Sequence, residues 1–410
     1  DTFNIALPAD AVSGRAQGAL VLDLPEGGPP VFTLQSDLRG VAMRLAGLGW
    51  SKPAETGGEF SISGTLGPTP TIDNLRLAAA GLSAEGTVTL SEDGALQSAE
   101  FSAVTLGDWL NAPVTLTGRG PGQPPGVAVT GGTIDLRALP PSEAGGEGSS
   151  GVPLNLALDR VIVTDDITLS PFRGQVTSSA GLNGTFEARM NGGAPVRGAL
   201  VPQRGRTAIR LQGDDAGAVI RDAGVFKSFD GGALDLIMVP RSEGSGFDGQ
   251  LQIRTTRLRD QPVMADLLDA VSIIGIIDQL QGPGILFDNV VAQFEITPDR
   301  LILEQGSAVG ASLGISLDGT YDLAGKQLDM QGVISPIYLF NAIGQIFTRR
   351  GEGLFGFTFR MTGDAETPRV SVNPLSILTP GMFREIFRRA PPGIERTPQR
   401  PPRQERREQP

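Results

Sequence analysis

The chain has 410 residues, a formal net charge of −11, 56 glycines, and neither cysteine nor histidine. Without cysteine and histidine there is no disulfide framework, no thiolate nucleophile and no histidine base or zinc ligand, so we expect neither an enzyme nor a metal or other cofactor. The acidic charge argues against nucleic acid as a partner, because phosphate contacts need clustered lysine and arginine.

Strict alternation of apolar and polar residues is the main pattern along the chain. From Leu82 to Leu90 every second residue is apolar or small, which predicts a half-buried β-strand. The same alternation recurs at 60–66, 182–190, 292–296, 311–317, 328–334 and 355–361. We expect a long antiparallel sheet with one apolar face from end to end.

Glycine occurs both in the turns between these strands and inside the strands. The pairs Asp93-Gly94, Asn191-Gly192 and Asp230-Gly231 predict hairpin turns, because these residues tolerate a positive φ. Glycines inside the strands remove side chains where a sheet bends strongly or where something packs on its backbone. These are Gly86, Gly184, Gly314 and Gly356, and they predict a strongly curved sheet.

Few segments have helical periodicity. Four short amphipathic helices are predicted, and three of them lie near the C-terminal end. They cover residues 215–226, 261–280, Ser335-Pro336 to Phe347, and 379–389. Such helices serve as lids, plugs or packing pieces. The longest apolar stretch, 271–277, is far shorter than the ~20 residues of a membrane span.

Composition divides the chain into three regions. Residues 1–258 read as repeating β-groove modules, with a soft break at the Pro-, Gly- and Ser-rich segment 139–151. Residues 259–389 form a C-terminal region that closes the groove. Residues 390–410 are rich in Pro, Arg, Gln and Glu with little to bury, so we expect them to be disordered.

Several blocks in the C-terminal third resemble, in the same order, the C-terminal region of AsmA-like proteins of the YhdP type. They are GPGILFDNVVAQFEI at 282–296, LILEQGSAVGASLGISLDGTYDL at 301–323, LDMQGVISPIYLFNAIGQI at 328–346 and GEGLFGFTFRMTGDAETPRVSVNPLSILTPGMFREIF at 351–387. Upstream, LGWSKP at 48–53 and DDAGAVI at 214–220 resemble the repeated sheet modules of that family. The chain departs from the family after Asn341, where an Ile-Pro-x-x-Gly segment is replaced by a run into Thr348-Arg349-Arg350.

The resemblance implies a fold, which is a taco-like β-groove with an apolar inner trough, and a function. It places the chain in the bridge-like lipid transfer superfamily, as the C-terminal portion of a periplasmic protein of Gram-negative bacteria. An anchor before Asp1 would hold the protein in the inner membrane, and its C-terminal end would meet the outer membrane. The expected function is phospholipid transport between the two membranes through the β-groove, which supports outer-membrane biogenesis and lipid homeostasis.

Two sets of residues are the candidates for this function. Groove-lining residues that would contact acyl chains are Leu82, Val88, Leu90, Leu182, Phe186, Met190, Phe294, Ile296, Leu313, Ile315, Leu317, Phe355, Phe357 and Phe359. A basic amphipathic segment would either touch a membrane or cap the end of the sheet, and it comprises Phe383, Arg384, Ile386, Phe387, Arg388 and Arg389.

Other interpretations use the same residues. The apolar positions could instead close on themselves as the dry core of a structural or adhesive β-solenoid. Asp165-Asp166 and Asp214-Asp215 could form a calcium or acid/base site, although aspartate at turns and helix starts usually has a capping role. With two Trp and two Tyr, an aromatic cleft of a glycan-processing enzyme is not expected.

Overall fold

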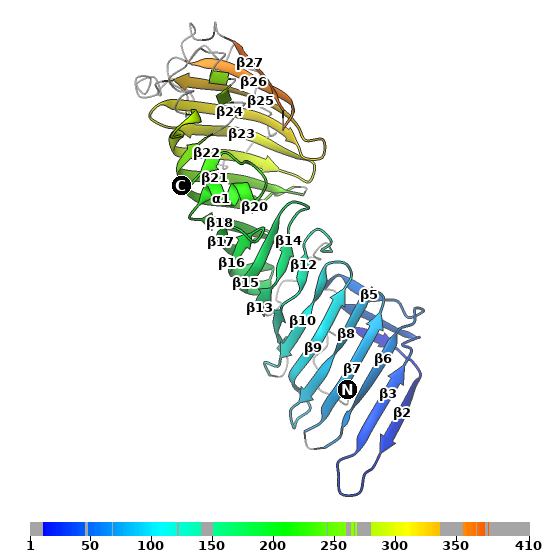
Figure 1. The fold of residues 1–410 in the computed structure, drawn as a ribbon. Helices are drawn as coiled ribbons and strands as arrows, with labels where there is room; N and C mark the ends of the chain where they lie inside the picture. Colours follow the sequence, from blue (N-terminus) through cyan, green and yellow to red (C-terminus); the bar gives the residue numbers. More distant parts are fainter. Residues whose placement is uncertain are drawn as a thin grey trace, which may run out of the picture.

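The computed structural model describes residues 11–45, 48–67, 69–120, 123–140, 151–243, 245–259, 264–265, 267–268, 280–336, 356–365, 367–373 and 376. These residues are mainly in β-strands, as the alternation predicts. Figure 1 shows the strands following one another along a long, twisted molecule, from β2 at one end to β27 at the other.

The strands are named in chain order. The first part contains β1 (Val12–Gly14), β2 (Gly18–Asp23), β3 (Val31–Ser36), β4 (Val41–Leu45), β5 (Trp50–Lys52), β6 (Glu59–Thr65), β7 (Thr71–Ala79), β8 (Leu82–Leu90), β9 (Leu96–Leu106), β10 (Leu110–Thr117), β11 (Gly126–Thr130) and β12 (Thr133–Asp135). The middle contains β13 (Val152–Leu158), β14 (Arg160–Ile162), β15 (Thr168–Ser179), β16 (Gly181–Met190), β17 (Pro195–Gln203) and β18 (Arg206–Gly213).

After the helix α1 (Ala216–Asp222), the last part contains β19 (Phe229–Asp230), β20 (Ala233–Pro240), β21 (Phe247–Leu258), β22 (Ile285–Ile296), β23 (Arg300–Val309), β24 (Leu313–Asp322), β25 (Gln327–Pro336), β26 (Phe357–Asp364) and β27 (Arg369–Asn373). Strand β8 has the bounds that the sequence predicts, and β6, β16, β22, β24, β25 and β26 contain or overlap the other predicted strands.

One large sheet holds all strands except β1, β4 and β5. Neighbouring strands are antiparallel, with one exception between β10 and β15. There β11 pairs in parallel with β13, and β12 with β14. Strands β11 and β13 therefore run in the same direction, and the predicted soft break at 139–151 lies between β12 and β13.

A small second sheet, in the order β1-β4-β5, lies beside the first part of the large sheet. Trp50 joins the two, since its indole nitrogen donates to the carbonyl of Ala80 at 2.9 Å. Lys52 is 1% exposed, and its ammonium donates to the carbonyls of Leu38, Val41 and Pro53 at 2.8, 2.8 and 3.1 Å. Three backbone acceptors thus replace the hydration of a buried charge.

The predicted helices have different outcomes. The prediction at 215–226 is confirmed by α1, whose first turn is capped by the Asp215 side chain. Within 261–280 the described residues 264–265, 267–268 and 280 are helical. The predicted helix start at Ser335-Pro336 is wrong, because these residues end β25. The rest of that helix and the segment 379–389 lie outside the described residues. None of the helices in the described part is long and apolar enough to cross a bilayer.

Two of the three predicted hairpin turns are confirmed. Asn191 and Gly192 join β16 to β17 with φ of 47° and 78°, and Gly94 lies between β8 and β9 with φ of 78°. The prediction at Asp230-Gly231 is wrong. The strands on its two sides, β19 and β20, both pair antiparallel with β21, so the chain continues in the same direction there and does not turn back.

Candidate functional site

One face of the large sheet is apolar from β2 to β27. Residues that pair across neighbouring strands point to the same face, so the register defines rows of side chains. One row takes one residue from each of 21 strands: Leu22, Phe32, Gly64, Ile72, Val88, Ala99, Leu116, Val127, Leu154, Val176, Gly184, Leu200, Ile209, Met238, Gly249, Phe294, Leu303, Gly319, Met330, Met361 and Val370.

A second row runs beside the first. It contains Leu20, Leu34, Ile62, Leu75, Gly86, Phe101, Val114, Val129, Leu156, Gly174, Phe186, Gly198, Leu211, Leu236, Leu251, Ala292, Gly306, Leu317, Gly332, Phe359 and Val372. Every position in both rows is an apolar side chain or glycine. We call these two rows the central stripe.

Burial separates the central stripe from one margin of the same face. Along that margin the side chains are at most 9% exposed, and they include Leu82, Leu106, Leu110, Leu158, Val161, Leu169, Met190, Val196, Leu234 and Ile253. We call it the covered margin. Ala216 and Val219 of α1, together with Leu38 and Trp50 beside the small sheet, belong to the same buried cluster.

Most side chains of the central stripe are half-buried or exposed. Eight others are as buried as the covered margin, at no more than 9% exposure: Val88, Ala99, Val114, Val129, Val176, Phe186, Leu303 and Phe359. Leu154, Leu200, Ile209 and Met238 are all half-buried, although each lies in the interior of the sheet and has paired strands on both sides. The elements that shield the covered margin therefore leave this stripe accessible. A large apolar surface that stays open to solvent is typical of a binding surface.

Large side chains on the stripe lie flat across glycines of the neighbouring strand. A Cβ placed on Gly198 would be 2.2 Å from Cζ of Phe186, and one on Gly249 would be 2.2 Å from Cζ of Phe294. Phe359 occupies the same position over Gly332, where the distance is 2.6 Å. Phe186 also stacks on Phe172 with ring centroids 5.1 Å apart. The rings therefore lie along the sheet over the glycine backbones and project little from its surface.

The opposite face is polar and carries ion pairs between strands. Arg76 and Glu85 approach to 2.6 Å, and so do Arg210 and Asp235. The hydrogen bond from Arg210 lowers the pKa of the Asp235 carboxyl. Arg360 and Asp329 pair at 3.1 Å. Water and charge therefore lie on one side of the sheet and hydrocarbon on the other.

The predicted groove residues fall into groups. Phe294 and Leu317 lie on the central stripe and are half-buried. Val88, Phe186 and Phe359 also lie on the stripe, but they are only 5–7% exposed. Leu82, Met190, Leu313 and Phe357 are buried at 0–9% exposure in the clusters of the covered margin, so direct access to them is blocked. Leu90 is 1% exposed in a small cluster with Ala99. Leu182, Ile296 and Ile315 are half-buried. Phe355 and the segment from Phe383 to Arg389 lie outside the described residues.

Sequence reasoning missed the middle of the stripe on β17, β18 and β20. Leu200, Ile209 and Met238 are central there, yet none lies in a segment singled out by its alternation. In β17 the alternating set is Val196, Gly198, Leu200 and Pro202, where glycine and proline interrupt the pattern. Glycine is already counted on the apolar face elsewhere, so the proline at 202 and the apolar residues on both faces, such as Val201 beside Leu200, hide this strand.

The adjacent aspartates have structural partners. Asp165 pairs with Arg137, and Asp214 pairs with Arg197 at 3.0 Å. The Asp215 carboxylate accepts a hydrogen bond from the amide of Ala218 at 2.9 Å and caps α1. Their observed contacts are those of turn and cap residues.

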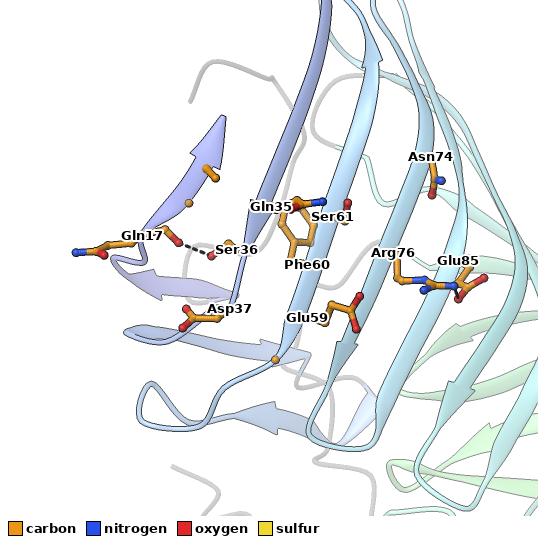
Figure 2. Close-up of a pocket in the computed structure, with 13 residues that line it drawn as sticks. Gln17, Gln35, Ser36, Asp37, Glu59, Phe60, Ser61, Asn74, Arg76 and Glu85 are labelled. Atoms are coloured by element: carbon orange, nitrogen blue, oxygen red, sulfur yellow. Dashed lines mark hydrogen bonds and ion pairs between the residues drawn. The ribbon is translucent and has the colours of Figure 1, made fainter. Parts of the chain in front are cut away.

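A hollow lies on the polar face near the end of the sheet that carries β2 (Figure 2). Gln35, Ser61, Arg76 and Glu85 face it from β3, β6, β7 and β8. The Ser36 hydroxyl donates to the carbonyl of Gln17 at 2.7 Å at its rim. Arg76 and Glu85 form an ion pair there, and Asp37 and Glu59 also line the hollow, so its lining carries more acidic than basic groups.

Comparison of the chain with models of protein families, with curated proteins and with solved structures gives no match.

Proposed function

We propose that the chain carries phospholipid between the inner and outer membranes of a Gram-negative bacterium, with the acyl chains on the central stripe and the headgroups in water. The observation that carries this proposal is the unbroken apolar register across 21 strands together with the partial exposure of its residues. The curvature of the sheet into a groove, and its closure near the C-terminal end, are part of the proposal.

The energetics favour hydrocarbon as the occupant. Each methylene group that leaves water for an apolar surface contributes about 0.8 kcal/mol, so a pair of fatty tails gains enough to hold a lipid without a specific pocket. Successive strands are about 4.8 Å apart, so 20 intervals between the strands of the stripe give a path on the order of 100 Å. A path of this length suits transfer between separate membranes better than storage of one ligand.

The resemblance to AsmA-like proteins of the YhdP type supplies the lipid class and the place. It supports phospholipid as the cargo, the periplasm as the compartment and an inner-membrane anchor in the full-length protein. The basic segment from Phe383 to Arg389 would then contact the outer membrane or cap the sheet. These assignments rest on the sequence blocks quoted above.

Lipid content tests the proposal. Leu200 and Val201 are neighbours on β17 that point to opposite faces, so Leu200→Asp places a charge on the stripe and Val201→Asp places the same charge on the polar face. We expect mass spectrometry of lipid extracts to show phospholipid with the wild-type protein and with Val201→Asp. Leu200→Asp should retain at most a third of that amount, while circular dichroism shows both variants folded.

The alternative of a structural or adhesive protein makes the opposite prediction. Its apolar face would be dry, so purified wild-type protein would contain no phospholipid and deletion would leave outer-membrane permeability unchanged. Equal lipid content in Leu200→Asp and Val201→Asp would also reject the stripe as the lipid path.

A further inference from the structure

The margin of the large sheet opposite the covered margin carries a series of hairpin turns. The turns after β17, β20, β22 and β24 all lie there, and we call it the open margin. In three of these turns a basic residue is accompanied by an acidic one. They are Arg241 with Glu243, Arg300 with Asp299, and Lys326 with Asp322. The turn after β17 differs, because it contains Arg204 and Arg206 and no acidic residue.

Arg204 has an unusual backbone conformation. Together with Gly205 it forms the two-residue turn between Gln203 and Arg206, with φ of 53° and 73°. Two successive positive φ angles favour asparagine followed by glycine, so arginine at the first position is strained. Its side chain is exposed and takes no part in the ion pairs of the described residues. Strain of this kind is often retained where a side chain has a function.

Arg206 is held beside the apolar face. Its guanidinium carbon lies 5.4 Å from the centre of the Phe247 ring, and a guanidinium nitrogen donates to the carbonyl of Gly246 at 3.3 Å. Phe247 pairs with Ile296 and lies two residues from Gly249 of the central stripe, so its ring is on the apolar face. A positive charge therefore meets hydrocarbon at this point of the open margin.

The part of the central stripe next to this turn is accessible. Its large side chains on β17, β18 and β20 are half-buried, and they are Leu200, Ile209, Leu211, Leu236 and Met238. Leu200 precedes Arg204 by four residues, which is about 13 Å along an extended strand. One lipid molecule spans roughly 20 Å, which is half the thickness of a bilayer. A single lipid can thus contact the stripe and the turn together.

We propose that Arg204, beside Arg206, binds the phosphate of a phospholipid whose acyl chains lie on the stripe from β17 to β21. A guanidinium donates paired, charge-assisted hydrogen bonds to phosphate. The occupant follows from the combination of an apolar surface with a cationic rim, since free phosphate needs no apolar surface and a neutral lipid needs no cation. This inference rests on the proposed lipid path and adds a headgroup site to it.

Calorimetric titration tests the site with short-chain phosphatidylglycerol below its micelle concentration, diacylglycerol with the same chains, and inorganic phosphate. Arg204→Asn should weaken binding of the phospholipid about tenfold and leave binding of the diacylglycerol unchanged, because it removes a charge-assisted contact to phosphate alone. Lys326→Asn is the matched control, because Lys326 is also exposed at the open margin with a φ of 51°. Its loss should leave both lipid affinities unchanged.

Stability separates binding from a structural role. Asparagine tolerates the left-handed backbone, so Arg204→Asn should raise the midpoint of urea unfolding while it weakens phospholipid binding. A lower midpoint, or a phospholipid affinity equal to that of the wild type, would overturn the headgroup site and leave the lipid path intact. Inorganic phosphate that binds as tightly as the phospholipid would also overturn it. Wild-type protein that binds neither lipid would reject the lipid path and the headgroup site together.

Discussion

Glycine shapes the apolar face at the residue scale by making room for its neighbours. Gly198, Gly249 and Gly332 lie beside phenylalanines whose rings fill the space that a Cβ would need. Each glycine is thus paired with a particular large side chain on the next strand. The cost of losing the glycine should depend on whether that ring is present.

A double-mutant cycle tests this dependence. Gly198→Ala should reduce the free energy of unfolding by about 1–3 kcal/mol, because the new methyl group displaces the Phe186 ring. In a Phe186→Ala background the same change should cost less than half as much. Urea unfolding measures both values. Gly67→Ala is the control, since its nearest heavy atom would be 4.0 Å away, and a full cost in the Phe186→Ala background would contradict the pairing.

The side chain of Asn191 makes three hydrogen bonds that join different segments of the chain. Its amide nitrogen donates to the carbonyls of Asp166 at 2.8 Å and Asp222 at 2.6 Å, and its side-chain oxygen accepts from the amide of Thr168 at 2.6 Å. Its φ of 47° also suits asparagine. The turn between β16 and β17 is therefore tied both to the loop before β15 and to the end of α1.

Two substitutions separate these contributions. Asn191→Ala loses the hydrogen bonds and strains the backbone, so it should lower the free energy of unfolding by about 2–4 kcal/mol. Asn191→Gly keeps the left-handed backbone and should recover about 1 kcal/mol of that loss. Chemical denaturation checks both, and equal stability of the two variants would show that the backbone conformation contributes nothing.

The ion pair of Asp235 makes stability depend on pH. Arg210 lowers the pKa of Asp235 in the folded protein, so the stabilisation is present above the unfolded pKa of about 3.9 and is lost as pH falls through the folded value. Asp235→Asn should destabilise by about 1 kcal/mol or less at pH 7. The difference from wild type should shrink below pH 4. Urea titrations at several pH values measure this stability difference. A difference that grows in acid would contradict a lowered pKa of Asp235 in the folded protein.

At the scale of elements, small pieces cover one margin of the apolar face and leave the central stripe open. The β1-β4-β5 sheet and α1 both contribute to the buried cluster of that margin. The small sheet depends on Lys52, whose ammonium holds three carbonyls from 38, 41 and 53 together. The stability of this cover should therefore rest on one side chain.

Lys52→Met tests that dependence. The methionine matches the length of the side chain but leaves the three carbonyls without a donor, so the cost should be about 2–4 kcal/mol. Hydrogen exchange should accelerate in β1, β4 and β5 and stay unchanged in β23 and β24. Arg39→Met is a control, because Arg39 is exposed and pairs with Asp37 at 3.8 Å. Unchanged hydrogen exchange in β4 would show that the Lys52 ammonium does not stabilise the small sheet.

The sequence predicts elements well where both of their faces have a clear pattern. Strand β8 alternates throughout and has its predicted bounds. The start of α1 is predicted from Asp215, which caps the helix. The wrong helix start at Ser335-Pro336 has a physical reason, since β25 continues there by pairing with Leu313 and Gly314 of β24. Long-range pairing overrides a local capping pattern, and sequence spacing alone does not contain it.

At the scale of the whole molecule, the apolar residues form separate clusters along the sheet. One extends from Leu38 to Ile253, and another from Leu258 to Phe359. The sequence predicts one apolar face. It does not predict that this face divides into a covered margin and a more exposed central stripe. Which residues are covered depends on how α1 and the small sheet pack on the large sheet, and the alternation of single strands does not contain that packing.

Separate clusters predict separate unfolding. Ile334 is 0% exposed in the C-terminal cluster and Leu106 is 2% exposed in the other. Ile334→Ala should speed hydrogen exchange in β24 to β26, and Leu106→Ala should do so in β8 to β10, each by an amount that corresponds to about 2–4 kcal/mol. Each variant serves as the control for the other. Uniform acceleration along the chain would instead show a single cooperative unit.

The flattened phenylalanines have a mechanical consequence. A ring that lies across a neighbouring glycine raises no ridge, so the apolar surface is smooth at the scale of one strand spacing. A molecule resting on it exchanges one set of weak dispersion contacts for an equivalent set with each small step. An alkyl tail on this surface, as proposed above, would therefore meet little resistance from the side chains beneath it.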